Sequence, residues 1–113
     1  MQEPGKADLT AWVDFGALRQ AVEASNADAS VHGPITQGQF LMAMGMEHRL
    51  DMLLQSKRTP EECASLEDGF AMLVAGVEHH PQGMGETFKA LAITPSRLAT
   101  PYPFDIDFAA LQR

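Results

Sequence analysis

Residues 33–45 read GPITQGQFLMAMG, and this stretch marks the predicted junction between a strand and a helix. Thr36 and Gln39 form a T-x-x-Q capping box, in which the threonine hydroxyl accepts from a helix amide and the glutamine reaches back. Gly45 is placed to end this short helix in the left-handed conformation. Pro34 is expected to break the strand that precedes the helix. The stretch therefore predicts a sharp change from extended chain to capped helix.

The same stretch contains two glycines, Gly33 and Gly38, that match the first half of the phosphate-binding pattern G-x-x-x-x-G-K-[ST]. The pattern needs a lysine for the phosphates and a hydroxyl for Mg²⁺, but Gln39 and Phe40 follow instead. Because the half of the motif that carries the chemistry is missing, we interpret both glycines as structural positions rather than as a nucleotide loop.

The rest of the chain predicts an α/β fold in a single unit, residues 1–113. Alternating residues in LTAWVDF are typical of a strand, and Asp14 then caps a helix whose apolar residues recur at helical spacing. RTPEEC carries a second capping box with proline at the first helical position. The expected elements are strands at about 9–13, 30–33 and 87–93, a helix at 15–25, and a helical insertion at about 36–77.

Composition excludes several classes of function. The chain has 113 residues, a formal net charge of −7 and a pI of about 4.9, so it should repel a nucleic-acid backbone. No apolar run approaches the ~18 residues of a membrane span, and the first residues lack the pattern of a secretory signal. The single cysteine, Cys63, suits a reducing compartment. We therefore expect no nucleic-acid or membrane partner and a cytoplasmic location.

Three blocks carry a resemblance to a known family: ADLTAWVDFGAL, GPITQGQFLMAMGMEHRLDMLL and MGETFKALAIT. In this order and spacing they resemble the C-terminal part of the MidA-like family of class I S-adenosylmethionine-dependent methyltransferases. The family includes a mitochondrial protein arginine methyltransferase of complex I assembly. The resemblance covers about residues 7–94. It departs from the family at Trp12, where the family often has histidine.

The resemblance implies a Rossmann-like sheet whose last three strands are the predicted ones, with the final strand antiparallel between the other two. It also implies that S-adenosylmethionine serves the full-length parent. The family's cofactor loop and acidic residue precede everything in this chain. The chain is therefore expected to be a C-terminal fragment that binds no cofactor and is inactive alone, while the parent methylates a protein substrate, plausibly at arginine.

The site residues that follow from these interpretations are few. Ligands in α/β sheets bind beyond the carboxyl ends of strands, so Asp14, Thr36 and Gln37 are candidates for substrate binding. A plain helix cap remains the alternative for Asp14. The four histidines show no convergent metal spacing, so no metal site is expected, and no catalytic residue is assigned.

A second function class stays open beside the enzyme fragment. A small acidic α/β chain with seven methionines and no cofactor loop could instead be a non-enzymatic protein-interaction module. An incomplete sheet would leave an exposed strand edge, through which the chain could associate with itself.

Overall fold

The computed structural model describes residues 14–56 and 58–111, where three successive helices separate the two strands. The predicted strand at 9–13 lies outside the described residues. Helix 15–25, the helical insertion and the two later strands are confirmed within a few residues. The elements are α1 Phe15–Ala24, β1 Ala29–Thr36, α2 Gln37–Ala43, α3 Met46–Gln55, α4 Pro60–Val74, β2 Lys89–Pro95 and α5 Phe108–Leu111.

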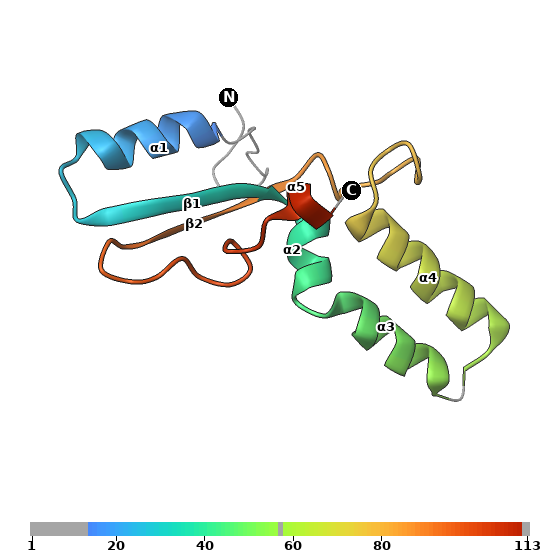
Figure 1. Ribbon diagram of the computed structural model, residues 1–113. Helices are drawn as coiled ribbons and strands as arrows, with labels where there is room; N and C mark the ends of the chain where they lie inside the picture. The colour runs from blue at the N-terminus through green and yellow to red at the C-terminus, as the bar shows by residue number, and fades with distance from the viewer. Residues whose placement is uncertain (1–13, 57, 112–113) are drawn as a thin grey trace, which may run out of the picture.

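The sheet consists of β1 and β2, which pair antiparallel, as expected for the last two predicted strands. Figure 1 shows the two strands side by side, although more than 50 residues of chain separate them. The expectation that Pro34 breaks β1 is wrong, because β1 runs on to Thr36. The register shifts between His32 and Ile35, and a proline, which has no amide hydrogen to donate, is tolerated at such an irregularity.

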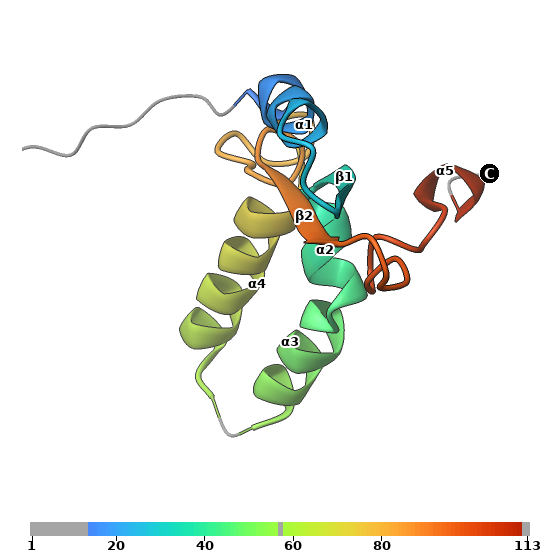
Figure 2. The same cartoon turned by 90° about the vertical axis from the view of Figure 1, so that its left-hand side faces the viewer.

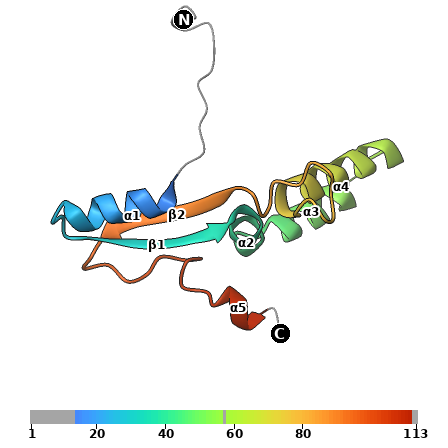
Figure 3. The same ribbon diagram turned by 90° about the horizontal axis from the view of Figure 1, so that it is seen from above.

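Helix α1 lies over one face of the sheet and runs antiparallel to β1 (Figures 1 and 3). Asp14 caps it, since its Oδ1 accepts from the Ala17 amide at 2.9 Å. Arg19 ties the helix to the strand: its guanidinium donates to the Val31 carbonyl at 3.3 Å and also to the Gly33 carbonyl. The position of α1 therefore depends on charge-assisted hydrogen bonds to the backbone.

The helical insertion folds as a short helix and a hairpin that projects away from the sheet (Figure 2). Gly45 ends α2 with a φ of +90°, and its amide donates to the Met42 carbonyl at 3.1 Å, as the sequence predicted. Thr59 caps α4 through the Glu62 amide at 3.1 Å, with Pro60 at the first helical position. Helices α3 and α4 run antiparallel and form the two sides of the hairpin.

The segment after β2 passes along the side of the sheet away from α1 (Figures 1 and 3). Phe104 packs against Gly33, where an added Cβ would lie 3.0 Å from its ring, and its ring centroid is 6.3 Å from that of Phe40. The Tyr102 hydroxyl donates to the Ala43 carbonyl, and Pro103 is fully buried. These contacts attach the C-terminal segment to β1 and α2.

The elements form an open arrangement without a closed core. Among the described residues, no large hydrophobic side chain is fully buried; the buried positions are Gly38, Gly76, Gly83, Gly85 and Pro103. Large hydrophobic side chains are exposed instead, including Met44 at 58% and Met52 at 60%. This degree of exposure is typical of a surface that another chain segment or another protein covers.

Candidate functional site

A junction of glycines joins the helical insertion to the sheet. Gly38, at the start of α2, and Gly85, in the loop before β2, both press against the end of α4. A Cβ added at Gly38 would lie 2.3 Å from the Val74 carbonyl oxygen, and one at Gly85 would lie 1.9 Å from the same atom. No other residue type fits either position without moving backbone, which is why three chain segments can meet here.

Backbone hydrogen bonds fasten the segments of this junction to one another. The Gly38 amide donates to the Gly85 carbonyl at 2.8 Å, and the Gly85 amide donates to the Ala75 carbonyl at 2.9 Å. The Gln37 amide donates to the Phe88 carbonyl at 2.8 Å. Each bond satisfies a polar group that the close packing shields from water, so the junction is held by backbone groups rather than by side-chain packing.

A pocket of about 420 Å³ opens at this junction, at the end of the sheet where β1 ends and β2 begins. Its lining is polar and contains one carboxylate, Glu86, and one ammonium, Lys89, whose Nζ donates to the Glu86 backbone carbonyl. The residues that line it are Thr36, Gly38, Gln39, Val74, Gly85, Glu86 and Lys89. The pocket can therefore hold a polar group near the carboxylate of Glu86 and the ammonium group of Lys89.

The structure brings two of the three predicted substrate residues to this junction. Thr36 lines the pocket, but its hydroxyl accepts from the Gln39 amide at 3.0 Å, while Gln39 Oε1 accepts from the Thr36 amide at 2.9 Å. The Gln37 side chain donates to the Leu73 carbonyl at 2.8 Å. Asp14 caps α1 and is not among the residues of the pocket. All three side chains have local structural partners.

Sequence reasoning missed Glu86 and Lys89. Both belong to the block MGETFKALAIT, which was interpreted only as a turn and a strand. A carboxylate directly after a tight glycine turn, Gly83 and Gly85, is the signal that could have marked the end of the sheet. This signal can be interpreted only when the pairing of β2 with β1 is known, because the pairing places the turn beside Thr36.

The two glycines of the opening stretch have structural roles, as interpreted. Gly33 lies inside β1 with a φ of +92°, and Gly38 is buried with its amide bonded to Gly85. A phosphate loop needs free amides that converge on one point between a strand and a helix. These glycines therefore do not fit a nucleotide or its phosphates, and we derive no chemistry of S-adenosylmethionine from them.

The histidine and aspartate side chains do not converge on a metal. Within residues 14–56 and 58–111, no group of three or more His, Cys, Asp or Glu side chains could hold a metal ion. His80 instead links α4 to the following loop: its Nε2 lies 2.9 Å from Asp68 Oδ1, and its Nδ1 accepts from the Gln82 amide at 3.0 Å. Because Nδ1 accepts, Nε2 carries the proton that is donated to Asp68.

The chain is similar to one part of several curated protein arginine methyltransferases. It is 37% identical over 112 residues to the mitochondrial protein arginine methyltransferase NDUFAF7 of Xenopus tropicalis, a match that covers 98% of this chain and 24% of that protein. It is 42% identical over 99 residues to the Drosophila melanogaster homologue and 40% identical over 92 residues to the Homo sapiens protein, covering 21% and 19% of their lengths. No family model matches the chain.

Identity at this level over most of its length shows that the chain is homologous to part of these protein arginine methyltransferases, as the MidA-like resemblance implied. The chain spans about a fifth to a quarter of the length of the curated relatives it matches. The predicted resemblance is confirmed, and the α/β architecture with its antiparallel strand pair is compatible with part of a methyltransferase fold.

The expected cytoplasmic location is wrong. The named relatives, from frog to nematode, are all mitochondrial proteins. A lone cysteine indicates a reducing compartment but does not separate the cytosol from other reducing compartments, so composition could not make this distinction. In the part of the chain that the structure describes, no helix is long and apolar enough to cross a membrane.

Proposed function

We propose that the chain forms the C-terminal, substrate-side part of an S-adenosylmethionine-dependent methyltransferase domain that methylates a protein, at an arginine side chain. The observation that carries the proposal is the 37–42% identity to protein arginine methyltransferases over most of the chain. In this assignment β1 and β2 are the last two strands of a Rossmann-like sheet.

The methyl donor binds, in this proposal, to parts of the longer protein that residues 1–113 do not contain. Gly33 and Gly38 both pack closely against other parts of the chain, and the Gly38 amide bonds to the Gly85 carbonyl. These roles support a binding site for the methyl donor elsewhere in the longer protein. The open arrangement also supports a segment that packs against further chain, since hydrophobic side chains such as Met44 and Val77 stay exposed. The isolated segment is therefore inactive.

The pocket at the glycine junction is the proposed substrate wall. Thr36 and Gln37 hold the start of α2 there, and Glu86 is a lining residue whose carboxylate would bind a guanidinium by charge-assisted hydrogen bonds. Asp14 begins α1, which lies over the same sheet, and is kept as a third substrate-side residue. The roles of these residues are to bind and position the substrate rather than to react with it.

A chimera tests the assignment. The matching 92 residues of the human relative would be replaced by those of this chain, and methyl transfer to the protein substrate would be measured. We expect the chimera to bind S-adenosylmethionine and to transfer methyl groups. Glu86→Gln should then raise the KM for the protein substrate more than it lowers kcat, because a binding residue acts mainly on substrate affinity.

Two results would count against the proposal. A chimera that folds and binds S-adenosylmethionine but transfers no methyl group would show that this segment does not supply the substrate side of the catalytic domain. Micromolar binding of S-adenosylmethionine to the isolated chain in a calorimetric titration would show that the donor site lies within residues 1–113.

The exposed methionines favour one alternative, a protein-interaction module without enzymatic activity. Met44 and Met52 are more than half exposed on the α2–α3 segment, and methionine suits adaptable binding surfaces. The chimera separates the two functions: an inactive chimera together with a stable, cooperatively folded isolated chain supports the module, whereas an active chimera supports the enzyme.

A further inference from the structure

Helices α3 and α4 enclose an apolar groove. The groove has a volume of about 270 Å³. Its lining combines apolar side chains from both helices with a single charged residue, Arg49. The lining consists of Met46, Arg49, Leu50, Leu53, Ser65, Leu66, Gly69, Phe70 and Leu73. A two-helix hairpin cannot bury such a stripe by itself, so the apolar residues stay accessible along the groove.

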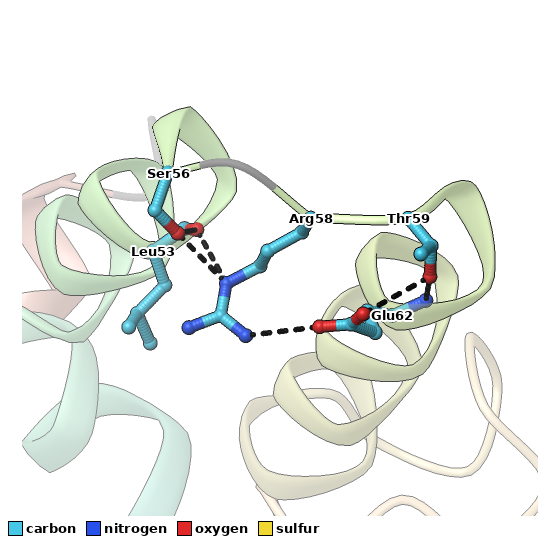
Figure 4. A network of polar contacts seen from close by, with 5 residues as sticks. All are labelled: Leu53, Ser56, Arg58, Thr59 and Glu62. Carbon is cyan, nitrogen blue, oxygen red and sulfur yellow. Dashed lines mark hydrogen bonds and ion pairs between the residues drawn. The ribbon is translucent and has the colours of Figure 1, made fainter.

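The tip of the hairpin is held by Arg58, as Figure 4 shows. Its Nε donates to the Leu53 carbonyl at 2.8 Å and to Ser56 Oγ at 2.9 Å, and its Nη1 lies 3.5 Å from Glu62 Oε2. The guanidinium thus joins the C-terminus of α3 to the first turn of α4. These bonds fix the angle between the helices, so the groove is a preformed surface.

Charged side chains lie at both ends of the hairpin: Arg49 at the α2 end, and Glu62 with its partner Arg58 at the tip. Arg49 lies in the first turn of α3, next to the α2 end of the hairpin, and is exposed. Glu62 lies in the first turn of α4, at the tip, on the same helical stripe as Leu66 and Leu73. Its side chain is 53% exposed despite the contact with Arg58, so its carboxylate can accept a second cation.

We propose that the groove is covered by the same hairpin of a second copy of this chain, with the two hairpins related by a twofold axis. In this pairing the tip of each hairpin lies beside the α2 end of the other, so that each Arg49 faces the Glu62 of the other copy. The four helices form a bundle around the joined apolar stripes. The reciprocal pairing of Arg49 with Glu62 makes the groove self-complementary, as a twofold interface requires.

The β1 edge of the sheet, another surface through which the chain was expected to self-associate, is less suited to it. The carbonyls of Val31 and Gly33 on β1 already accept from Arg19, so an added strand would have to displace charge-assisted hydrogen bonds. The hairpin offers an apolar surface instead. With 15 residues, α4 is about 22 Å long, and two adjacent helices are about 20 Å wide. A face of this size corresponds to a small interface, of the kind found in weak and transient association.

Sedimentation equilibrium on the full chain, from low to high micromolar concentration, tests the proposal. We expect a monomer–dimer equilibrium. Arg49→Glu and Glu62→Lys should each weaken the dimer at least about tenfold, because each places like charges opposite one another twice per dimer. An equimolar mixture of the two variants should restore dimers, since both contacts of the mixed dimer again join an acidic side chain to a basic one. Circular dichroism checks that each variant retains its helices.

Arg97→Glu is the matched control, because it makes the same charge change in the exposed turn after β2, far from the hairpin. It should leave the dimer unchanged. A monomeric wild-type chain at high micromolar concentration overturns the proposal, as does a dimer that survives both single variants, which would instead implicate the sheet edge. A mixture of variants that stays monomeric also overturns it. None of these readouts depends on methyl transfer, so this inference and the proposed function can fail separately.

Discussion

At the scale of single residues, the glycines of the junction decide how closely the insertion approaches the sheet. The α-carbon hydrogens of Gly38 and Gly85 take the place of side chains that would collide with the Val74 carbonyl. Gly83 is restricted in the same way, because an added Cβ would lie 2.5 Å from the Ala75 carbonyl oxygen. Space, rather than backbone conformation, explains these three residues, since only Gly33 and Gly45 have a positive φ among the described glycines.

Gly85→Ala should destabilise the chain strongly. Its methyl group would lie 1.9 Å from a backbone oxygen, and neither backbone segment can move without breaking the Gly85–Ala75 hydrogen bond. We expect a loss of about 3 kcal/mol or more in the free energy of unfolding, measured by urea denaturation. Gly69→Ala is the control: no heavy atom lies within 4 Å of the added Cβ, so the change should stabilise α4 by about 0.5–1 kcal/mol. Equal effects of the two changes would contradict this account.

Arg19→Met should loosen α1 from the sheet without affecting the hairpin. The substitution keeps an apolar stem but removes the two hydrogen bonds to β1, which we expect to cost about 1–3 kcal/mol. Hydrogen exchange of the α1 amides should become faster, whereas exchange in α4 should not change. Unchanged protection of α1 would show that these hydrogen bonds do not hold the helix.

At the scale of elements, local capping decides where the helices begin. Asp14, Thr36 and Thr59 each accept from a backbone amide of the first helical turn, at 2.9, 3.0 and 3.1 Å. Because donor and acceptor lie three residues apart, each cap forms without help from the rest of the molecule. The hairpin depends on such local bonds in particular, since its apolar groove stays open in the single chain.

Thr59→Ala tests the contribution of one cap. It leaves the Glu62 amide without its side-chain acceptor and should lower the stability of the chain by about 1 kcal/mol. Thr59→Ser keeps a hydroxyl and should be close to neutral. Thermal unfolding followed by far-ultraviolet circular dichroism compares the two variants, and an alanine variant as stable as the serine variant would contradict the assignment.

At the scale of the whole molecule, the lack of a closed core should appear in the unfolding of the single chain. The slope of the unfolding free energy against urea concentration rises with the surface that unfolding exposes. Because the described hydrophobic side chains are only partly buried, we expect a slope at or below about 1 kcal/mol/M at low protein concentration. A slope of about 2 kcal/mol/M would show that the chain buries as much surface as a compact domain of its length.

Several features of the fold could be predicted because they depend on neighbouring residues. The capping box of Thr36 and Gln39, the cap at Thr59 (where Glu62 does not complete a box), the left-handed end at Gly45 and the helical spacing all involve groups within a turn of one another. The course of β1 past Pro34 could not be predicted in this way. It depends on pairing with β2, which lies more than 50 residues later in the chain.

The sequence by itself determined the starts of the helices after Asp14, Thr36 and Thr59, the two strand segments, and the resemblance that the comparison confirmed. Only the tertiary structure decided that Thr36, Glu86 and Lys89 share a pocket, because contacts between residues about 50 positions apart leave no periodic signal. It also decided that Gly38 and Gly85 serve packing and that the hairpin presents an open apolar groove. The physical reason is that caps and periodicity are local, whereas pockets and grooves arise where distant segments meet.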